Sequence, residues 1–181
     1  IARTADAVTI ACAGRPPEVV SHVVFAAHGD EVLPMLTDAT PVERDVLSAF
    51  QTTPNRAVLH TDSSWLPRRA AARAAWNYLL GDTSSGATVT YDLNRLQRLE
   101  TRRSYCVTLN PQVPIAAEHV LRSMDYTHPL YTRAAVRAQA RWAEISGVAR
   151  THFCGAYWFY GFHEDGLRSA VRAAGSLGVR W

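Results

Sequence analysis

Short runs of apolar and β-branched residues alternate along the chain with segments of helical periodicity. The runs predict strands at 6–10, 23–27, 56–60, 74–80, 87–92, 104–109 and 151–154. Helical spacing predicts helices at 31–36, from Thr40 onward, at 93–98, at 132–145 and from Gly166 onward. Strands and helices in mixed order predict a fold between the α/β and α+β classes.

Two of these segments also predict which side chains are buried. The helix from Thr40 has a capping residue, Pro41 in its first turn and Glu43 three positions after the cap. Its predicted apolar face consists of Val42, Val46, Leu47 and Phe50. In the fourth predicted strand, alternation places Trp76 and Tyr78 on one side, and we interpret them as a core-facing aromatic pair.

The composition describes a folded chain. Its 181 residues are 48% hydrophobic, which is enough for one core or two small lobes. No apolar run reaches the length of a transmembrane segment, and the first residues show neither a signal peptide nor an initiator Met. The three Cys residues are far apart and form no CxxC pair, which argues against a disulfide framework and suits a reducing compartment. We therefore predict a cytoplasmic location.

Residue types exclude several classes of function. All 19 basic residues are Arg, so Schiff-base and phosphate-loop lysines are ruled out. The Arg residues are scattered, with the densest group at 68–73, and we predict no nucleic-acid partner. The His residues lack HxxxH and HExxH spacing, and Ser63 and Ser64 lack a GxSxG context. We predict neither a metal site nor a serine hydrolase.

The segment FCGAYWFYGFHEDGLRSAVRAAG, at 153–175, carries the most specific pattern. A strand ends at a glycine, a cluster of aromatic residues follows, and HEDG opens a helix. The amides of Asp165, Gly166 and Leu167 would favour an anion at the helix N-terminus, and the aromatic residues could wall a flat ring. The carboxylates of Glu164 and Asp165 suit helix capping or hydroxyl groups better than a phosphate. Taken alone, these residues favour a plainer structure, a capped helix over a core with aromatic packing.

This segment resembles the C-terminal flavin-binding segment of the flavin-containing amine oxidase-like oxidoreductases. The whole chain is similar, more narrowly, to a bacterial group of predicted NAD/FAD-binding proteins of that class. The stretches that carry this similarity, in order, are VVFAAHGDEVLPML, NRAVLHTDSSWLPRR, AAWNYLL, VTYDLNRLQ, YCVTLNP and YTHPLY. The resemblance spans almost all 181 residues.

The resemblance implies an FAD cofactor and a set of residues around it. The implied cofactor-binding residues are Gly155, Ala156, Phe162, His163, Glu164, Asp165, Gly166 and Leu167. Phe162 or His163 would lie near the flavin ring, and His163 is the one candidate for a catalytic role. Ala156 stands where an acidic residue is common in the superfamily, so a side-chain contact with the cofactor would be lost there.

The resemblance also implies that a part of the protein lies upstream. The dinucleotide fingerprint GxGxxG, which holds the FAD pyrophosphate, is absent from this sequence. We expect the C-terminal part of a two-domain FAD-linked oxidoreductase, with an upstream dinucleotide-binding segment as its partner. Residues 1–36 and 146–181 would be returning pieces of the FAD-binding domain, and 37–145 the substrate domain.

The resemblance leaves the small-molecule substrate open between an amine, a lipid and a polyene. Hydride transfer from that substrate to the flavin is the expected reaction. The alternative is a cofactor-free folded fragment or interaction module without activity of its own. The stretch HTDSSWLP has two interpretations that also stay open, a polar loop after a strand or a part of the substrate cavity.

Overall fold

The structure, a computed structural model, describes residues 1–80 and 88–179. The segment GDTSSG at 81–86, whose residues indicate a turn between the strands predicted at 74–80 and 87–92, falls outside these residues. Within the described ranges, no helix combines the length and the apolar character needed to cross a membrane.

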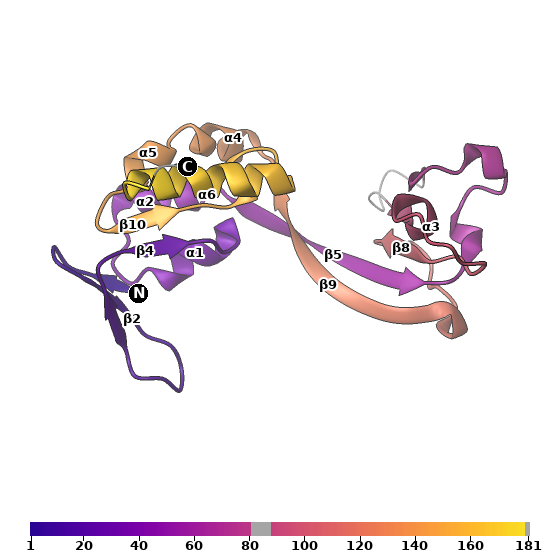
Figure 1. The fold of residues 1–181 in the computed structure, drawn as a ribbon, viewed down its shortest axis with the longest axis horizontal. Coiled ribbons are helices and arrows are strands. Elements are labelled where there is room, and N and C mark those ends of the chain that lie inside the picture. The colour runs from indigo at the N-terminus through magenta and orange to yellow at the C-terminus, as the bar shows by residue number, and fades with distance from the viewer. Residues whose placement is uncertain (81–87, 180–181) are drawn as a thin grey trace. The chain divides into compact units, whose positions relative to one another are not determined.

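The chain divides into two compact units (Figure 1). Unit 1 consists of residues 1–53 and 129–181, and unit 2 consists of residues 54–128. Both limits fall inside long strands. The sequence predicted limits after residues 36 and 145, between a domain that binds FAD and a domain that binds the substrate. That functional division stays a prediction.

A parallel pair of strands forms the centre of unit 1. Strand β4 (Val23–Phe25) pairs in parallel with β10 (Thr151–Phe153), and both lie within runs that the sequence predicted as strands. The surrounding helices are α1 (Gly29–Met35), α2 (Pro41–Leu47), α4 (Arg133–Gln139), α5 (Trp142–Ile145) and α6 (His163–Ser176). Helix α6 runs alongside β10 (Figure 1). Phe25 and Phe153 stack with ring centroids 5.6 Å apart in the core.

A small antiparallel sheet at the N-terminus is tied to unit 1 by a buried ion pair. Its strands are β1 (Ala2–Arg3), β2 (Val8–Ile10) and β3 (Glu18–Val20). The Arg3 guanidinium donates to both carboxylate oxygens of Glu43, and the Nη2–Oε2 distance is 2.8 Å. Both side chains are 3% exposed. Glu43 also completes the predicted capping box with Thr40, so one carboxylate both begins α2 and holds β1.

Unit 2 is built on a five-stranded sheet in the order β6-β7-β8-β5-β9. The strands are β5 (Gln51–His60), β6 (Trp76–Leu79), β7 (Thr88–Asp92), β8 (Cys106–Leu109) and β9 (Val120–Leu130). The short helices are α3 (Leu93–Leu96), η1 (Ser63–Trp65), η2 (Ala70–Ala72) and η3 (Ala117–His119). Strand β9 was not predicted, because it is an edge strand with mostly exposed residues and therefore lacks apolar alternation.

The sheet of unit 2 buries the side opposite to the predicted one. Trp76 and Tyr78 are 62% and 60% exposed, so the interpretation as a core-facing pair is wrong. Asn77 is buried instead, because its amide accepts a hydrogen bond from the Ala74 N–H and donates to the Thr90 carbonyl. A polar residue can occupy the buried side when its hydrogen bonds are made within the sheet.

The helices also differ from prediction in three details. Val42 is 41% exposed, whereas the other three residues of the predicted α2 face are buried. The segment predicted as one helix at 132–145 is two helices, and the break lets the Trp142 indole donate to the Phe153 carbonyl at 2.8 Å. Helix α6 begins at His163, three residues before Gly166.

We predict that Glu43→Gln lowers the free energy of unfolding by about 3 kcal/mol, because Arg3 loses its buried counter-charge. Urea unfolding at neutral pH measures this change. Glu144→Gln is the matched control, since Glu144 pairs with Arg141 at the surface, and it should change the midpoint far less. Equal effects of the two substitutions would contradict the role of the buried pair.

Because the Glu43 carboxylate is titratable, we also predict that the stability of the fold depends on pH. Burial alone would raise the pKa of Glu43, but hydrogen bonds from Arg3 and from the Thr40 amide outweigh it and hold the pKa below its ordinary 4.5. The charged group therefore stabilises the fold above that value, and this contribution is lost as pH falls through the lower folded pKa. The stability difference between the wild type and Glu43→Gln should shrink between neutral pH and about pH 3. A difference independent of pH would contradict this.

Candidate functional site

The carboxyl ends of β4 and β10 lie at the same edge of the sheet, because the two strands are parallel. Two loops leave this edge. The loop after β4 leads to α1, and the loop after β10 passes through Gly155 and the short helix η4 (Ala156–Trp158) before it reaches α6. In open α/β sheets such an edge is the usual place for a ligand.

Tyr157 fills the space between these two loops. A side-chain Cβ at Gly29 would lie 3.1 Å from the Tyr157 ring, and one at Gly155 would overlap that ring. Gly155 also has a φ of +149°, which disfavours any other residue. Burial raises the pKa of the Tyr157 hydroxyl, which has no hydrogen-bond partner in the described structure. The ring therefore fixes how closely the two loops approach.

Hydrogen bonds tie the start of α6 to the loop before it. The Asp165 carboxylate accepts from the N–H groups of Tyr160 and Phe162, at 3.1 and 3.0 Å. The Ser169 hydroxyl accepts from the Gly155 N–H at 2.8 Å and donates to the Gly166 carbonyl. Asp165 is therefore a helix cap, as one of the two interpretations of the sequence held.

The free amides of α6 differ from the predicted set. The Gly166 N–H already donates to the Phe162 carbonyl at 3.2 Å, and Leu167 lies beyond the first turn. The prediction that these two amides face an anion is wrong, because the helix begins earlier than the sequence indicated. The amides of the first turn belong to His163, Glu164 and Asp165.

The aromatic cluster that precedes α6 divides into two groups. Tyr157 and Trp158 are buried in the core of unit 1, where both rings pack edge-on against Phe50. Tyr160 and Phe162 are 78% and 66% exposed beside the start of α6. Phe159, between the two groups, is partly buried against the core and stacks with the Arg168 guanidinium, so Tyr160 and Phe162 are the aromatic residues most open to a ligand.

The implied cofactor-binding residues lie in two short stretches of the chain, 155–156 and 162–167. Gly155 and Ala156 lie at the end of β10, and the other six form the first turns of α6 and its N-cap. Of these six, Phe162, His163, Glu164 and Leu167 are exposed.

Sequence reasoning missed Tyr131 at this site. Its hydroxyl occupies the position that a Cβ of Gly161 would take. Burial raises the pKa of Tyr131, and the negative charge of Asp165 raises it further, so this hydroxyl lies close to the start of α6. The adjacent Gly161, with a φ of +90°, was the one signal in the sequence of a close approach.

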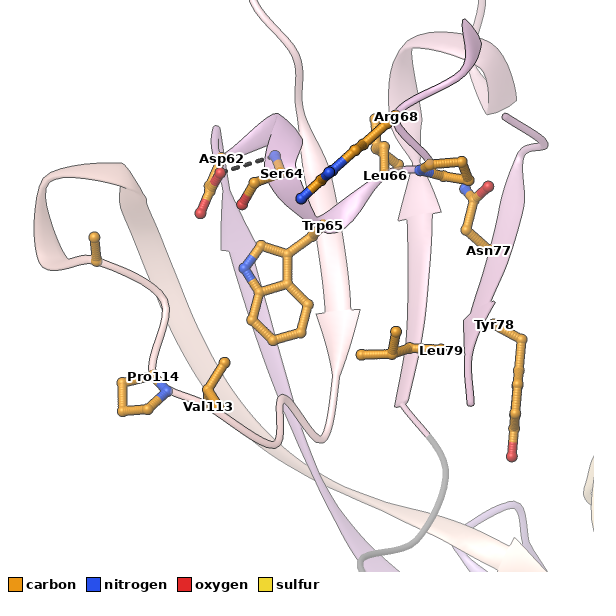
Figure 2. A pocket seen from close by; sticks show the side chains of 12 residues that line it. Asp62, Ser64, Trp65, Leu66, Arg68, Asn77, Tyr78, Leu79, Val113 and Pro114 are labelled. Carbon is orange, nitrogen blue, oxygen red and sulfur yellow. Dashed lines mark hydrogen bonds between the residues drawn. The ribbon is translucent and has the colours of Figure 1, made fainter. Parts of the chain in front are cut away.

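A separate pocket of about 590 Å³ opens in unit 2 (Figure 2). The segment HTDSSWLP supplies much of its wall, and β6 supplies the opposite side. Its apolar lining consists of Trp65, Leu66, Pro67, Tyr78, Leu79, Val113, Pro114 and Ala116, and its polar lining of Asp62, Ser64, Arg68 and Asn77. This volume is in the range of small-molecule sites.

The polar groups of this pocket differ in how well they are paired. The pKa of Asp62 is lowered, chiefly by hydrogen bonding to Ser64, whose N–H lies 2.9 Å from the carboxylate. The Asn77 amide is engaged by the N–H and carbonyl of Ala74, in the loop before β6, and by the Thr90 carbonyl in β7. Figure 2 shows Arg68 extending toward Ser64, above the Trp65 ring.

Comparison with known proteins identifies solved structures of similar fold. No protein-family model matches the sequence, and no curated protein matches it. A solved structure assigned as a protoporphyrinogen oxidase from Exiguobacterium sp. 255-15 matches with a TM-score of 0.68 and 12% identity, over 99% of this chain and 46% of that one. Cyclohexylamine oxidase from Brevibacterium oxydans IH-35A matches with a TM-score of 0.61 and 13% identity, over 98% and 48%. The CLA-producing fatty acid isomerase from P. acnes matches with a TM-score of 0.60 and 13% identity, over 97% and 44%.

The chain has the fold of about half of each of these enzymes. It spans less than half of the length of each solved chain. The predicted fold class, a mixture of helices and sheet, is confirmed by these matches. At 12–13% identity the likeness concerns the fold alone.

We predict that Gly155→Ala lowers the free energy of unfolding by about 1–3 kcal/mol, because its φ and the Tyr157 ring both exclude a Cβ. Gly166→Ala is the matched control. A Cβ there would meet nothing within 4 Å, so Ala should stabilise α6 by about 0.5–1 kcal/mol. Thermal unfolding measures both, and a neutral Gly155→Ala would show that the two loops are not held by Tyr157.

Proposed function

We propose that this chain is the C-terminal part of an FAD-dependent oxidoreductase of the amine oxidase-like class. The solved structures of similar fold include proteins named as a protoporphyrinogen oxidase and a cyclohexylamine oxidase, and the resemblance of the sequence to the amine oxidase-like class spans almost all 181 residues. The missing GxGxxG fingerprint belongs, in this proposal, to a dinucleotide-binding segment that completes unit 1. A cofactor-free module is the less favoured alternative, because an isolated module would not need the open sheet edge described next.

The observation that carries the proposal is the outer edge of β4. Bonds from the Val23 N–H to the Arg150 carbonyl and from the Cys154 N–H to the Phe25 carbonyl run to the β10 side. The peptide groups of Val24 therefore point to the opposite side, where no strand pairs with β4 among residues 1–80 and 88–179. The Val24 side chain is also 45% exposed. A two-stranded parallel sheet is not a stable unit by itself, which supports further strands from another segment.

The far edge of β10 is closed in a different way. The Ser146 hydroxyl accepts from the Phe153 N–H, the Trp142 indole donates to the Phe153 carbonyl, and the Gly147 N–H donates to the Thr151 carbonyl. These contacts replace a neighbouring strand on that side. The sheet can therefore grow only beyond β4, and we place the dinucleotide-binding strands there.

The start of α6 fits the polar part of a flavin better than a phosphate. Glu164 is exposed in the first turn and would repel phosphate, whereas Asp165 is engaged as a cap. Gly166 has nothing within 4 Å of its Cβ position, so internal packing does not explain a glycine inside the helix. The open space at Gly166 would let a cofactor come close to the start of the helix, where the amide groups of His163 and Glu164 would bind it.

FAD, when bound, would accept a hydride from the substrate. The residues of this chain would bind and orient the cofactor, and Phe162 and Tyr160 would keep water from its ring. His163 stays the candidate for a polar group beside the reacting atoms. The substrate class is open, because similar folds occur in proteins named for a porphyrinogen, an amine and a fatty acid.

The test begins with the reading frame upstream of the codon for Ile1. We expect it to encode a strand followed by GxGxxG, and the protein expressed with that segment to be yellow, with bound FAD. In that protein, Gly166→Ala should lower the FAD content, whereas Gly175→Ala, at another open position of α6, should not. An upstream frame without the fingerprint, or a colourless protein, would contradict the proposal.

A further inference from the structure

The pocket of unit 2 offers a binding site that the proposed flavin site does not use. We propose that this pocket binds a compact aromatic or similarly apolar molecule that carries one carboxylate, with Arg68 as the anion-binding group. This inference concerns unit 2 alone and does not depend on FAD.

The walls of the pocket suit a flat apolar body. Figure 2 shows the Trp65 ring projecting into the pocket, with Leu79 on one side and Val113 and Pro114 on the other. Trp65 is half-buried and ends the one-turn helix η1. Aromatic and proline faces provide large contact area to a ring at a small cost in side-chain entropy. The apolar part of a ligand would lie against Trp65.

The charge of the pocket favours an anion. Arg68 is exposed in the lining of the pocket, and none of the described residues forms a hydrogen bond or ion pair with its guanidinium. A guanidinium has five N–H donors in a geometry that matches a carboxylate. Arg68 therefore has free N–H donors next to an apolar wall, and an amphipathic carboxylate needs both.

Asp62 does not turn the pocket into a cation site. Its carboxylate accepts from the Ser64 N–H at 2.9 Å, and hydrogen bonding to Ser64 is the main reason that its pKa is lowered. The charge of Asp62 is thus compensated by its own loop, whereas that of Arg68 is not. Asn77 adds no free donor or acceptor, because the sheet engages its amide.

Three probes with the same ring and different charge test the inference. They are 2-naphthylacetate, 2-naphthylethanol and 2-naphthylethylamine, and binding to the 181-residue chain is measured by isothermal titration calorimetry. We expect the carboxylate to bind about tenfold tighter than the neutral alcohol, and the amine to bind most weakly. Added salt should reduce the advantage of the carboxylate.

The matched variants are Arg68→Gln and Arg69→Gln. Arg69 is the neighbouring exposed residue, is not part of the lining, and makes no side-chain cap bond to η2. Arg68→Gln should lower the affinity for 2-naphthylacetate to that for 2-naphthylethanol. Arg69→Gln should change the affinity for 2-naphthylacetate by less than about twofold. Trp65→Leu should weaken all three probes together.

Three results would overturn the inference. One is equal affinity for the carboxylate and the alcohol in the unmodified chain. Another is tighter binding of the amine that Asp62→Asn abolishes, which would make the pocket a cation site. The last is equal losses from Arg68→Gln and Arg69→Gln, which would mean that net charge and not the pocket attracts the anion.

Discussion

The parallel pairing of β4 with β10 is the constraint on which unit 1 depends. It joins residues 23–25 to residues 151–153, so the core closes only when two distant parts of the chain meet. The same pairing brings two loops to one edge of the sheet and sets Tyr157 between Gly29 and Gly155. Helix α6 then follows as a consequence, because Ser169 fixes it to the Gly155 amide.

The sequence predicted those elements whose signals are local. The capping box at Thr40 and Glu43 fixed the start of α2, and the apolar runs identified β4 and β10. Signals failed where tertiary contacts decide the outcome. Strand β9 has no apolar alternation because it lies at an edge of the sheet. Asn77 is buried only because its side-chain amide forms hydrogen bonds with Thr90 in β7 and with Ala74 in the loop before β6.

The candidate sites show the same division between local and distant information. Gly155 could be identified from sequence, since a glycine after a strand is a local pattern, whereas the start of α6 was placed three residues too late. The contribution of Tyr131 could not, because it arrives from the end of β9. The segment HTDSSWLP was left between a loop and a cavity wall, and only the facing strand β6 shows that it lines a pocket.

The central claim is that unit 1 is completed by strands that carry the phosphate-binding part of a flavin site. Amide hydrogen exchange tests it most directly, by comparing the 181-residue chain alone with the chain joined to its upstream segment and loaded with FAD. The account predicts slower exchange in the joined protein at Val24 and at the amides of His163 and Glu164. Unchanged exchange at these amides in a protein that holds FAD would contradict it.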